Sequence, residues 1–338
     1  TRGAAPAIEL LASRRRPRRS DLSALAGAGT GRVGSRRSGC RPSPPAPGLA
    51  GMLGGSLGSG AEGRGKGIGM QRVLITGAAG GIGRCLREDL HGLYPAIRLS
   101  DIAAMAPARA GEEVMPADLA DLAACERLCA GVDGIVHLGG QAVEAGWEQV
   151  LQANIIGSYH LFEAARRQGV QRVVFASTNH VIGFYHRTRR IDHQVPVRPD
   201  SRYGVSKAFG EALGRFYADK HGLRVLNIRI GNYGEQPLDR RRLAIWISPR
   251  DFLQLVRIGL DHPDLHYEVV YGASENDRSW WDNANAYRLG YRPQDESETF
   301  AAGILASEPG PVDPVAELFQ GGPFCSVEFD GDLELIAD

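Results

Sequence analysis

A glycine-rich segment near residue 80 limits the folds open to this chain. It follows the apolar run Val73–Thr76 and reads Thr76-Gly-Ala-Ala-Gly-Gly-Ile-Gly83. Gly77 permits a tight turn, Gly80 lets the backbone approach a pyrophosphate, and Gly83 lets a helix lie against the strand. The N-terminus of that helix attracts the anion. The pattern predicts a strand–turn–helix unit that binds a dinucleotide, although the same glycines can form a turn without a ligand.

Strand-like and helix-like segments alternate through the middle of the chain. Short apolar runs rich in β-branched residues are typical of a parallel sheet covered on both faces. We therefore predict an α/β fold, a Rossmann-type doubly wound parallel sheet with a small C-terminal substrate-binding portion, mainly after residue 231. The expected strands are Val73–Thr76, Ile97–Ser100, a short one near Val114, Gly134–Leu138, Arg172–Ala176 and Val225–Ile230. The expected helices are Ile82–Leu93, Leu119–Leu128, Trp147–Gln168, Tyr203–His221 and, after the alternation ends at Ile230, Pro249–His262.

Two aspartates follow expected strands at the edge where a nucleotide would bind. Asp101 ends the second strand, where a carboxylate can accept hydrogen bonds from ribose hydroxyls and repel a 2′-phosphate, so NAD is favoured over NADP. Asp118 follows the short strand near Val114 and can lie along the adenine. A plain helix cap before Leu119 is the alternative for Asp118.

A tyrosine and a lysine four residues apart, Tyr203 and Lys207, are the strongest sign of chemistry. The chain has only three lysines, and this spacing places both side chains on one helix face. A nearby ammonium favours the phenolate and can make a phenol a working base. The alternative is a solvated helix face, because such pairs also arise by chance.

The first 69 residues differ in composition from the rest. They hold twelve of the 39 basic residues and three of the 39 acidic ones, and they are rich in Gly, Ser, Pro and Ala. Such a segment buries too little apolar surface to offset chain entropy, so we expect residues 1–69 to be disordered. The tail resembles a transit peptide, and its arginine run could bind nucleic acid. An over-extended reading frame that starts natively at Met70 is the simplest explanation, and it leaves residues 70–338 as one NAD-binding domain.

Neither a membrane nor a metal is expected. No apolar run is long enough to cross a bilayer, and the five cysteines show no metal-ligand spacing. An odd cysteine count without a secretory signal suggests reduced thiols and a cytoplasmic protein.

The ordered set of motifs resembles one family. The glycine turn, Asp101, Asp118-Leu119, His137–Gly140, Asn154-x-x-Gly157, Ser177–His180 and Tyr203-x-x-x-Lys207 occur in the order seen in extended short-chain dehydrogenases/reductases. Within that family the chain is most similar to the bacterial uronate dehydrogenases. The likeness covers roughly Met70 to Phe324.

The resemblance implies that NAD oxidises the anomeric hydroxyl of galacturonate or glucuronate to an aldarolactone. It makes Tyr203 the base, makes Lys207 the group that lowers the phenol pKa and holds the nicotinamide ribose, and makes Thr178 the partner of the reacting oxygen. Ser177 can exchange roles with Thr178. The cofactor residues that the resemblance implies are Gly77, Gly80, Gly81, Ile82, Gly83, Asp101, Ile102, Asp118, Leu119, Leu138, Gly139, Asn154 and Lys207.

The same resemblance implies a sugar-binding set. It comprises Ser177, Thr178, Asn179, His180, Asn232 and Arg241. Arg241 would clamp the carboxylate of the substrate, since a guanidinium offers two parallel donors; a solvated arginine loop is the alternative. The resemblance also implies a homo-oligomer built from the helices Trp147–Gln168 and Tyr203–His221.

Two departures keep other functions open. Ala142 and Asn232 stand where uronate enzymes are expected to have serines, and Asn232-Tyr-Gly234 is similar to a segment of nucleotide-sugar epimerases and dehydratases. An NAD-retaining nucleotide-sugar epimerase or dehydratase is therefore the alternative. A third hypothesis is a redox-sensing NAD-binding regulator, against which the Tyr203–Lys207 pair argues.

Overall fold

The structure, a computed structural model, describes residues 69–307 and 312–336. Contacts divide the chain into two units, Thr1–Gly39 and Cys40–Asp338, and every described residue belongs to the second. The expectations for residues 1–68 therefore lie outside the described residues. No helix in the described ranges is long and apolar enough to cross a membrane.

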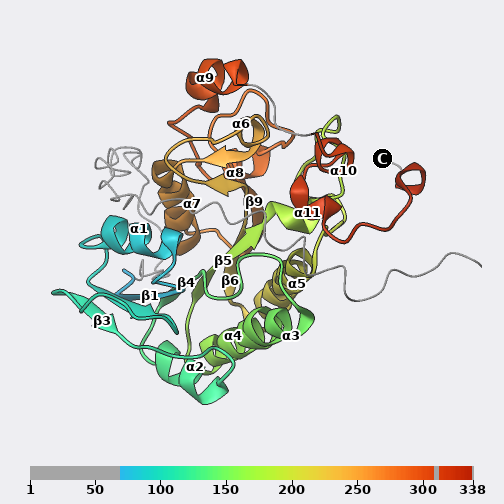
Figure 1. Ribbon diagram of the computed structural model, residues 1–338. Coiled ribbons are helices and arrows are strands. Elements are labelled where there is room, and N and C mark those ends of the chain that lie inside the picture. The colour runs from blue at the N-terminus through green and yellow to red at the C-terminus, as the bar shows by residue number, and fades with distance from the viewer. Residues whose placement is uncertain (1–68, 308–311, 337–338) are drawn as a thin grey trace, which may run out of the picture. The chain divides into compact units, whose positions relative to one another are not determined.

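A seven-stranded parallel sheet forms the centre of the described unit (Figure 1). Its strand order is β3-β2-β1-β4-β5-β6-β9, so the chain reverses its direction of winding between β1 and β4. This topology confirms the predicted Rossmann-type doubly wound sheet, and ligands bind at such a reversal point. The strands are β1 (Arg72–Thr76), β2 (Ala96–Ser100), β3 (Glu112–Val114), β4 (Gly134–His137), β5 (Arg172–Thr178), β6 (Arg224–Ile230) and β9 (Tyr267–Gly272).

Helices cover both faces of the sheet, which explains the unbroken apolar runs of the strands. In β1, Val73 and Ile75 join one core cluster and Leu74 joins the other, and all three are fully buried. Two apolar faces on one strand leave no room for alternation with polar residues. One cluster includes residues of α1 (Gly81–Leu90) and α7 (Pro249–Asp261); the other includes residues of α2 (Leu122–Cys129), α4 (Gly157–Arg167) and α5 (Arg202–His221).

Several element boundaries differ from the sequence predictions. The helix predicted from Trp147 to Gln168 contains a π-helical turn, η2 (Leu151–Ile156), between α3 (Trp147–Val150) and α4. Helix α2 begins at Leu122, because Asp121 caps it by accepting a hydrogen bond from the Ala123 amide. Asp118 is therefore not the cap of α2, and that alternative was wrong.

The C-terminal portion contains a strand that the sequence analysis missed. We expected the alternation to end at Ile230, but β9 extends the sheet by one parallel strand next to β6. The first two residues of β9 are only partly buried. Its apolar run is therefore short, and it lacks the alternation of polar and apolar residues that would mark a strand. The remaining elements are β7 (Asn232–Tyr233), α6 (Arg242–Ile245), β8 (Trp246–Ile247), α8 (Ala284–Arg288), α9 (Ala301–Ala306), α10 (Pro314–Leu318) and α11 (Pro323–Ser326), with 3-10 turns at Asn179–Ile182, Ser297–Phe300 and Leu333–Leu335.

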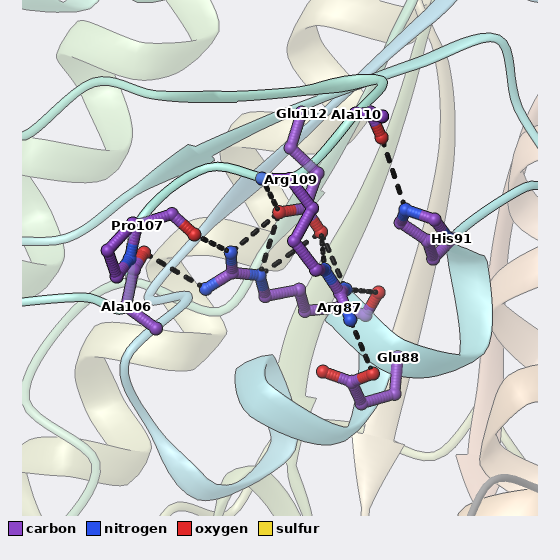
Figure 2. A network of polar contacts seen from close by, with 8 residues as sticks. All are labelled: Arg87, Glu88, His91, Ala106, Pro107, Arg109, Ala110 and Glu112. Atoms are coloured by element: carbon purple, nitrogen blue, oxygen red, sulfur yellow. Dashed lines mark hydrogen bonds and ion pairs between the residues drawn. The ribbon is translucent and has the colours of Figure 1, made fainter.

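A charged network fastens the loop between β2 and β3 (Figure 2). The Glu112 side chain is buried and accepts hydrogen bonds from the guanidinium groups of Arg87 and Arg109 at 2.6–3.1 Å. Arg87 also donates to the carbonyls of Ala106 and Pro107. Desolvation alone would raise the pKa of Glu112, but the two arginines outweigh it and lower the pKa to about 2. The network thereby holds the loop that follows Asp101.

We predict that Glu112→Gln destabilises the protein by about 1–3 kcal/mol at neutral pH, because it removes charge-assisted hydrogen bonds and leaves two guanidinium groups without their carboxylate. The folded pKa lies below the usual value, so this stabilisation is present above about pH 4.5 and is lost as the pH falls toward 2. Urea unfolding at several pH values measures both effects.

Glu88→Gln is the matched control, since Glu88 pairs with Arg109 at the surface. It should change stability by less than about 1 kcal/mol. Equal losses in the two variants would contradict the importance of the buried carboxylate.

Candidate functional site

The first cavity lies where the winding of the sheet reverses. Its volume is about 280 Å³. Its lining includes eight of the predicted cofactor residues, namely Gly77, Gly80, Asp101, Ile102, Asp118, Leu119, Leu138 and Gly139. The carboxyl ends of β1, β2 and β4 therefore meet around one hollow, as the glycine motif predicts.

Gly77 and Gly83 must be glycines for two distinct steric reasons. Gly77 has a φ of +70°, and a Cβ there would lie 2.7 Å from the Leu138 carbonyl carbon. A Cβ on Gly83 would lie 2.3 Å from the Gly77 carbonyl oxygen, so this position lets α1 pack on the turn. Gly80 precedes the first residue of α1 with an extended backbone. The turn thus presents backbone amides and the N-terminus of α1 to the cavity, which suits an anionic pyrophosphate.

Asp101 is held by backbone amides on both of its oxygens. It accepts hydrogen bonds from the Ala79 amide at 3.0 Å and the Ala103 amide at 2.9 Å. Its carboxylate is therefore fixed beside the glycine turn, at the edge of the cavity. Asp118, across the cavity, accepts from the Ala120 amide at 2.9 Å and so forms its own turn.

A second cavity of about 240 Å³ borders the first and shares Leu138, Gly140, Gln141 and Ala142 with it. Its lining includes Ile82, Ser177, Thr178, Asn179, His180, Tyr203 and Lys207. These residues come from α1, the end of β5 and the first turns of α5. The structure thus joins the predicted catalytic residues to the predicted nucleotide side through one pair of cavities.

Tyr203, Lys207 and Thr178 lie together, as expected from the sequence. Ser201 caps α5 by accepting from the Gly204 amide at 3.0 Å, which places Tyr203 and Lys207 on the first turns. The Lys207 ammonium lies 5.9 Å from the Tyr203 ring centroid, and Thr178 lines the same cavity as these two residues. Burial raises the pKa of Tyr203 to about 12 and lowers that of Lys207 to about 8. Tyr203 is therefore a phenol at rest, and added positive charge nearby would favour its ionisation.

Ser177 and Thr178 face different partners. The Ser177 hydroxyl donates to Glu211 at 2.6 Å, and Glu211 forms a buried bidentate ion pair with Arg229 at 2.9 Å. The Thr178 hydroxyl instead accepts from the His180 amide at 3.3 Å, so its own hydrogen is not committed to a carboxylate of the described residues. The geometry therefore favours Thr178 over Ser177 as the partner of a reacting oxygen.

Asn154 lies behind the cavities. It is buried in η2, accepts from the Gln141 amide at 2.7 Å and donates to the Gln141 carbonyl at 3.0 Å. It also donates to the Ser206 hydroxyl on α5 at 2.9 Å. Asn154 thus fixes the loop after β4, which lines both cavities, relative to the helix that carries Tyr203.

Arg241 reaches the second cavity through Asn179. Its Nε and Nη2 donate to the Gln320 carbonyl at 3.0 and 2.8 Å. With the Asn179 amide oriented to satisfy its neighbours, its nitrogen donates to the Ile230 carbonyl at 3.2 Å and its oxygen accepts from Arg241 at 3.1 Å. Burial lowers the pKa of Arg241 to about 10, and no carboxylate in the described ranges forms an ion pair with it. The result is a partly buried cation next to the site.

Five predicted residues do not line the cavities, namely Gly81, Gly83, Asn154, Asn232 and Arg241. Arg241 contacts Asn179, which lines the second cavity, but does not line it itself. Asn232 pairs with Trp246 between β7 and β8. Gly81 stands at the first position of α1. In the described parts of the chain no group of three or more His, Cys, Asp or Glu residues could hold a metal ion.

The sequence analysis missed the C-terminal wall of the site. The Phe324 ring stacks on His180 with a centroid distance of 3.8 Å, and Asp200 lies 2.7 Å from His180 Nδ1. Gln320 is fully buried and donates to the carbonyls of His186 and Arg189 while accepting from the Trp281 indole. The Gly321-Gly322 pair before Pro323 marks a turn, but no pattern in the sequence links this turn to His180.

Residues 73–251 match the model of the NAD dependent epimerase/dehydratase family. The chain belongs to this family. It is 49% identical over 254 residues to the uronate dehydrogenase of Pseudomonas putida, a match that covers 75% of this chain and 95% of that protein. It is 48% identical to the uronate dehydrogenase of Agrobacterium fabrum, over 75% of this chain and 97% of that protein. The crystal structure of uronate dehydrogenase from Agrobacterium tumefaciens has 47% identity and a TM-score of 0.74, with 77% of this chain and 98% of that chain covered.

We predict that Asp101→Ala narrows the preference for NADH over NADPH by about tenfold or more. The change removes an acceptor for ribose hydroxyls and a charge that repels a 2′-phosphate. Fluorescence titration with each reduced nucleotide measures the two affinities without any assumption about the substrate.

Asp121→Ala is the control, because Asp121 caps α2 and does not line the cavity. It should leave the ratio of affinities unchanged. Equal binding of both nucleotides by the unmodified protein would contradict the role of Asp101.

Proposed function

We propose that this protein oxidises the anomeric hydroxyl of galacturonate or glucuronate to an aldarolactone, with NAD as the hydride acceptor and NADH released. The observation that carries the proposal is the partly buried Arg241, which lies beside the Tyr203–Thr178 cavity and has no carboxylate partner among the described residues. The relatives named uronate dehydrogenase support the same substrate class.

The residues around the first cavity fit an NAD molecule. The glycine turn and the start of α1 would hold the pyrophosphate, Asp101 the adenosine ribose, and Lys207 the nicotinamide ribose. Gly77 supports this fit, since a side chain there would close the turn against Leu138. When bound, NAD would supply the hydride acceptor and, in its oxidised form, the positive charge of its nicotinamide ring.

Once ionised, Tyr203 would take the proton of the anomeric hydroxyl at its phenolate oxygen. Thr178 would hold the reacting oxygen, since it lines the same cavity as Tyr203 while the Ser177 hydroxyl is bound to Glu211. The Lys207 ammonium favours the ionised phenol. Burial of Lys207 lowers its own pKa to about 8. Proton transfer by a positioned group of this kind contributes about 10²–10⁴ in rate.

Arg241 would recognise the carboxylate of the sugar acid together with Asn179. Its Nη1 makes no hydrogen bond to any described residue, so a donor remains for the substrate. A desolvated cation without a counter-charge gains more from an anion than an exposed one does. His180 lines the same cavity and would bind a sugar hydroxyl.

The alternative function, an NAD-retaining nucleotide-sugar epimerase or dehydratase, has less support. This alternative rests on the segment Asn232–Gly234. Its first two residues form β7, which pairs with β8, and only Tyr233 of the segment lines the second cavity. A cavity of about 240 Å³ suits a single sugar acid better than a nucleotide-sugar.

We also propose a cytoplasmic homo-oligomer. Trp147 on α3, Tyr159 on α4 and Phe216 on α5 are 46–49% exposed. These three helices therefore present aromatic side chains that a second copy could cover.

Arg241→Met should erase most of the preference for a uronate over the corresponding neutral sugar. Loss of a charge-assisted hydrogen bond is worth roughly 1.5–3 kcal/mol, about ten- to a hundredfold in kcat/KM. NADH formation at 340 nm with galacturonate, glucuronate, galactose and glucose measures the discrimination in both proteins.

Arg240→Met is the matched control, because Arg240 is exposed and donates only to the carbonyls of Leu305 and Ser307. It should retain the preference. An unmodified protein that shows no preference for the acid, or an Arg241→Met variant that keeps it, would refute this assignment.

A further inference from the structure

Asp200 is a buried carboxylate behind the second cavity that the proposed reaction does not yet use. Its side chain is fully shielded from solvent, and one oxygen lies 2.7 Å from His180 Nδ1. The other oxygen accepts from the Ser201 hydroxyl at 2.8 Å. The Asp200 amide also donates to the His180 carbonyl at 3.2 Å. Two contacts between the same pair of residues fix the carboxylate on the imidazole.

Two glycines leave the space that Asp200 occupies. A Cβ on Gly183 would lie 1.9 Å from the Asp200 oxygen that faces His180, and a Cβ on Gly321 would lie 2.0 Å from the same oxygen. The two glycines are far apart in the chain and enclose one atom from two segments. Backbone limits this niche, so the carboxylate has little freedom to turn away from His180.

The His180 ring is held on its faces as well as at its edge. Phe324 stacks on it with an interplanar angle of 24°, and Tyr203 lies edge-on at 5.9 Å. His180 lines the catalytic cavity, and its Nε2 makes no hydrogen bond to any residue that the structure describes. The ring therefore has one nitrogen committed to Asp200 and the other available to a ligand.

We propose that Asp200 is a positioning residue for the substrate, which fixes His180 in the tautomer that presents Nε2 as a hydrogen-bond acceptor to a sugar hydroxyl. A carboxylate only accepts hydrogen bonds, so Nδ1 carries the hydrogen and Nε2 of the neutral ring has a free lone pair. The identity of the ligand as a sugar acid rests on the proposed function. The tautomer itself follows from the Asp200–His180 geometry.

Two-bond ¹H–¹⁵N correlation NMR reports the tautomer directly. His180 is assigned by the loss of its signals in His180→Gln. In the unmodified protein we expect the hydrogen on Nδ1. In Asp200→Ala the ring should shift toward the Nε2–H form, and Asp200→Asn, whose amide oxygen can still accept, should restore the Nδ1–H form in part.

Asp192→Asn is the control for loss of a carboxylate, because the Asp192 side chain is exposed and accepts from the Gln194 amide. It should leave the His180 signals unchanged. An Nε2–H tautomer in the unmodified protein overturns the proposal even if Asp200→Ala fails to fold. An unchanged spectrum in Asp200→Ala also overturns it.

A double-mutant cycle tests whether Asp200 acts through His180. Asp200→Ala and His180→Ala should each lower kcat/KM for the uronate about ten- to a hundredfold, and the double variant should lose little more than His180→Ala alone. NADH affinity should stay constant in all three. Additive losses would make Asp200 merely structural. If no uronate is oxidised by the unmodified protein, the proposed function fails while the NMR result still decides the role of Asp200.

Discussion

The close crossing of two chain segments at the reversal point of the sheet determines where everything else can lie. The turn after β1 meets the end of β4 so closely that a Cβ on Gly77 would lie 2.7 Å from the Leu138 carbonyl carbon. This contact places the start of α1, Asp101 and the loop after β4 around one cavity. The loop is then tied to α5 through Asn154, so the position of Tyr203 also depends on that crossing. A side chain larger than hydrogen at position 77 would disturb both cavities at once.

Local signals in the sequence were enough for the nucleotide half of the site. The glycine turn, Asp101 and the Tyr203–Lys207 spacing each depend on residues within one turn or one helix, and eight predicted cofactor residues line the first cavity. The strands up to β6 were predicted because their apolar runs are buried on both faces. Strand β9 was missed, since it begins with partly buried residues and has only one neighbour in the sheet.

The substrate half was predicted less well because it depends on contacts between distant segments. Arg241 is held by the Gln320 carbonyl, His180 by Asp200 and Phe324, and Asp200 by glycines at 183 and 321. Such contacts leave no periodic pattern in the sequence. The residues from Gln320 to Phe324 read as a loop, yet they contact the Arg241 guanidinium and the His180 imidazole. Shape in this half comes from backbone carbonyls and from glycines that leave room for charged groups.

The central claim is that the cavities place an anomeric C–H bond against a nicotinamide and release the reduced nucleotide. Glucuronate carrying deuterium at the anomeric carbon tests it most directly, with the position of the label followed by NMR and mass spectrometry. The account predicts one deuterium in the reduced nucleotide for each lactone formed, and free NADH in solution. Label retained in the sugar, with no reduced nucleotide released and a nucleotide-sugar turned over instead, would contradict it.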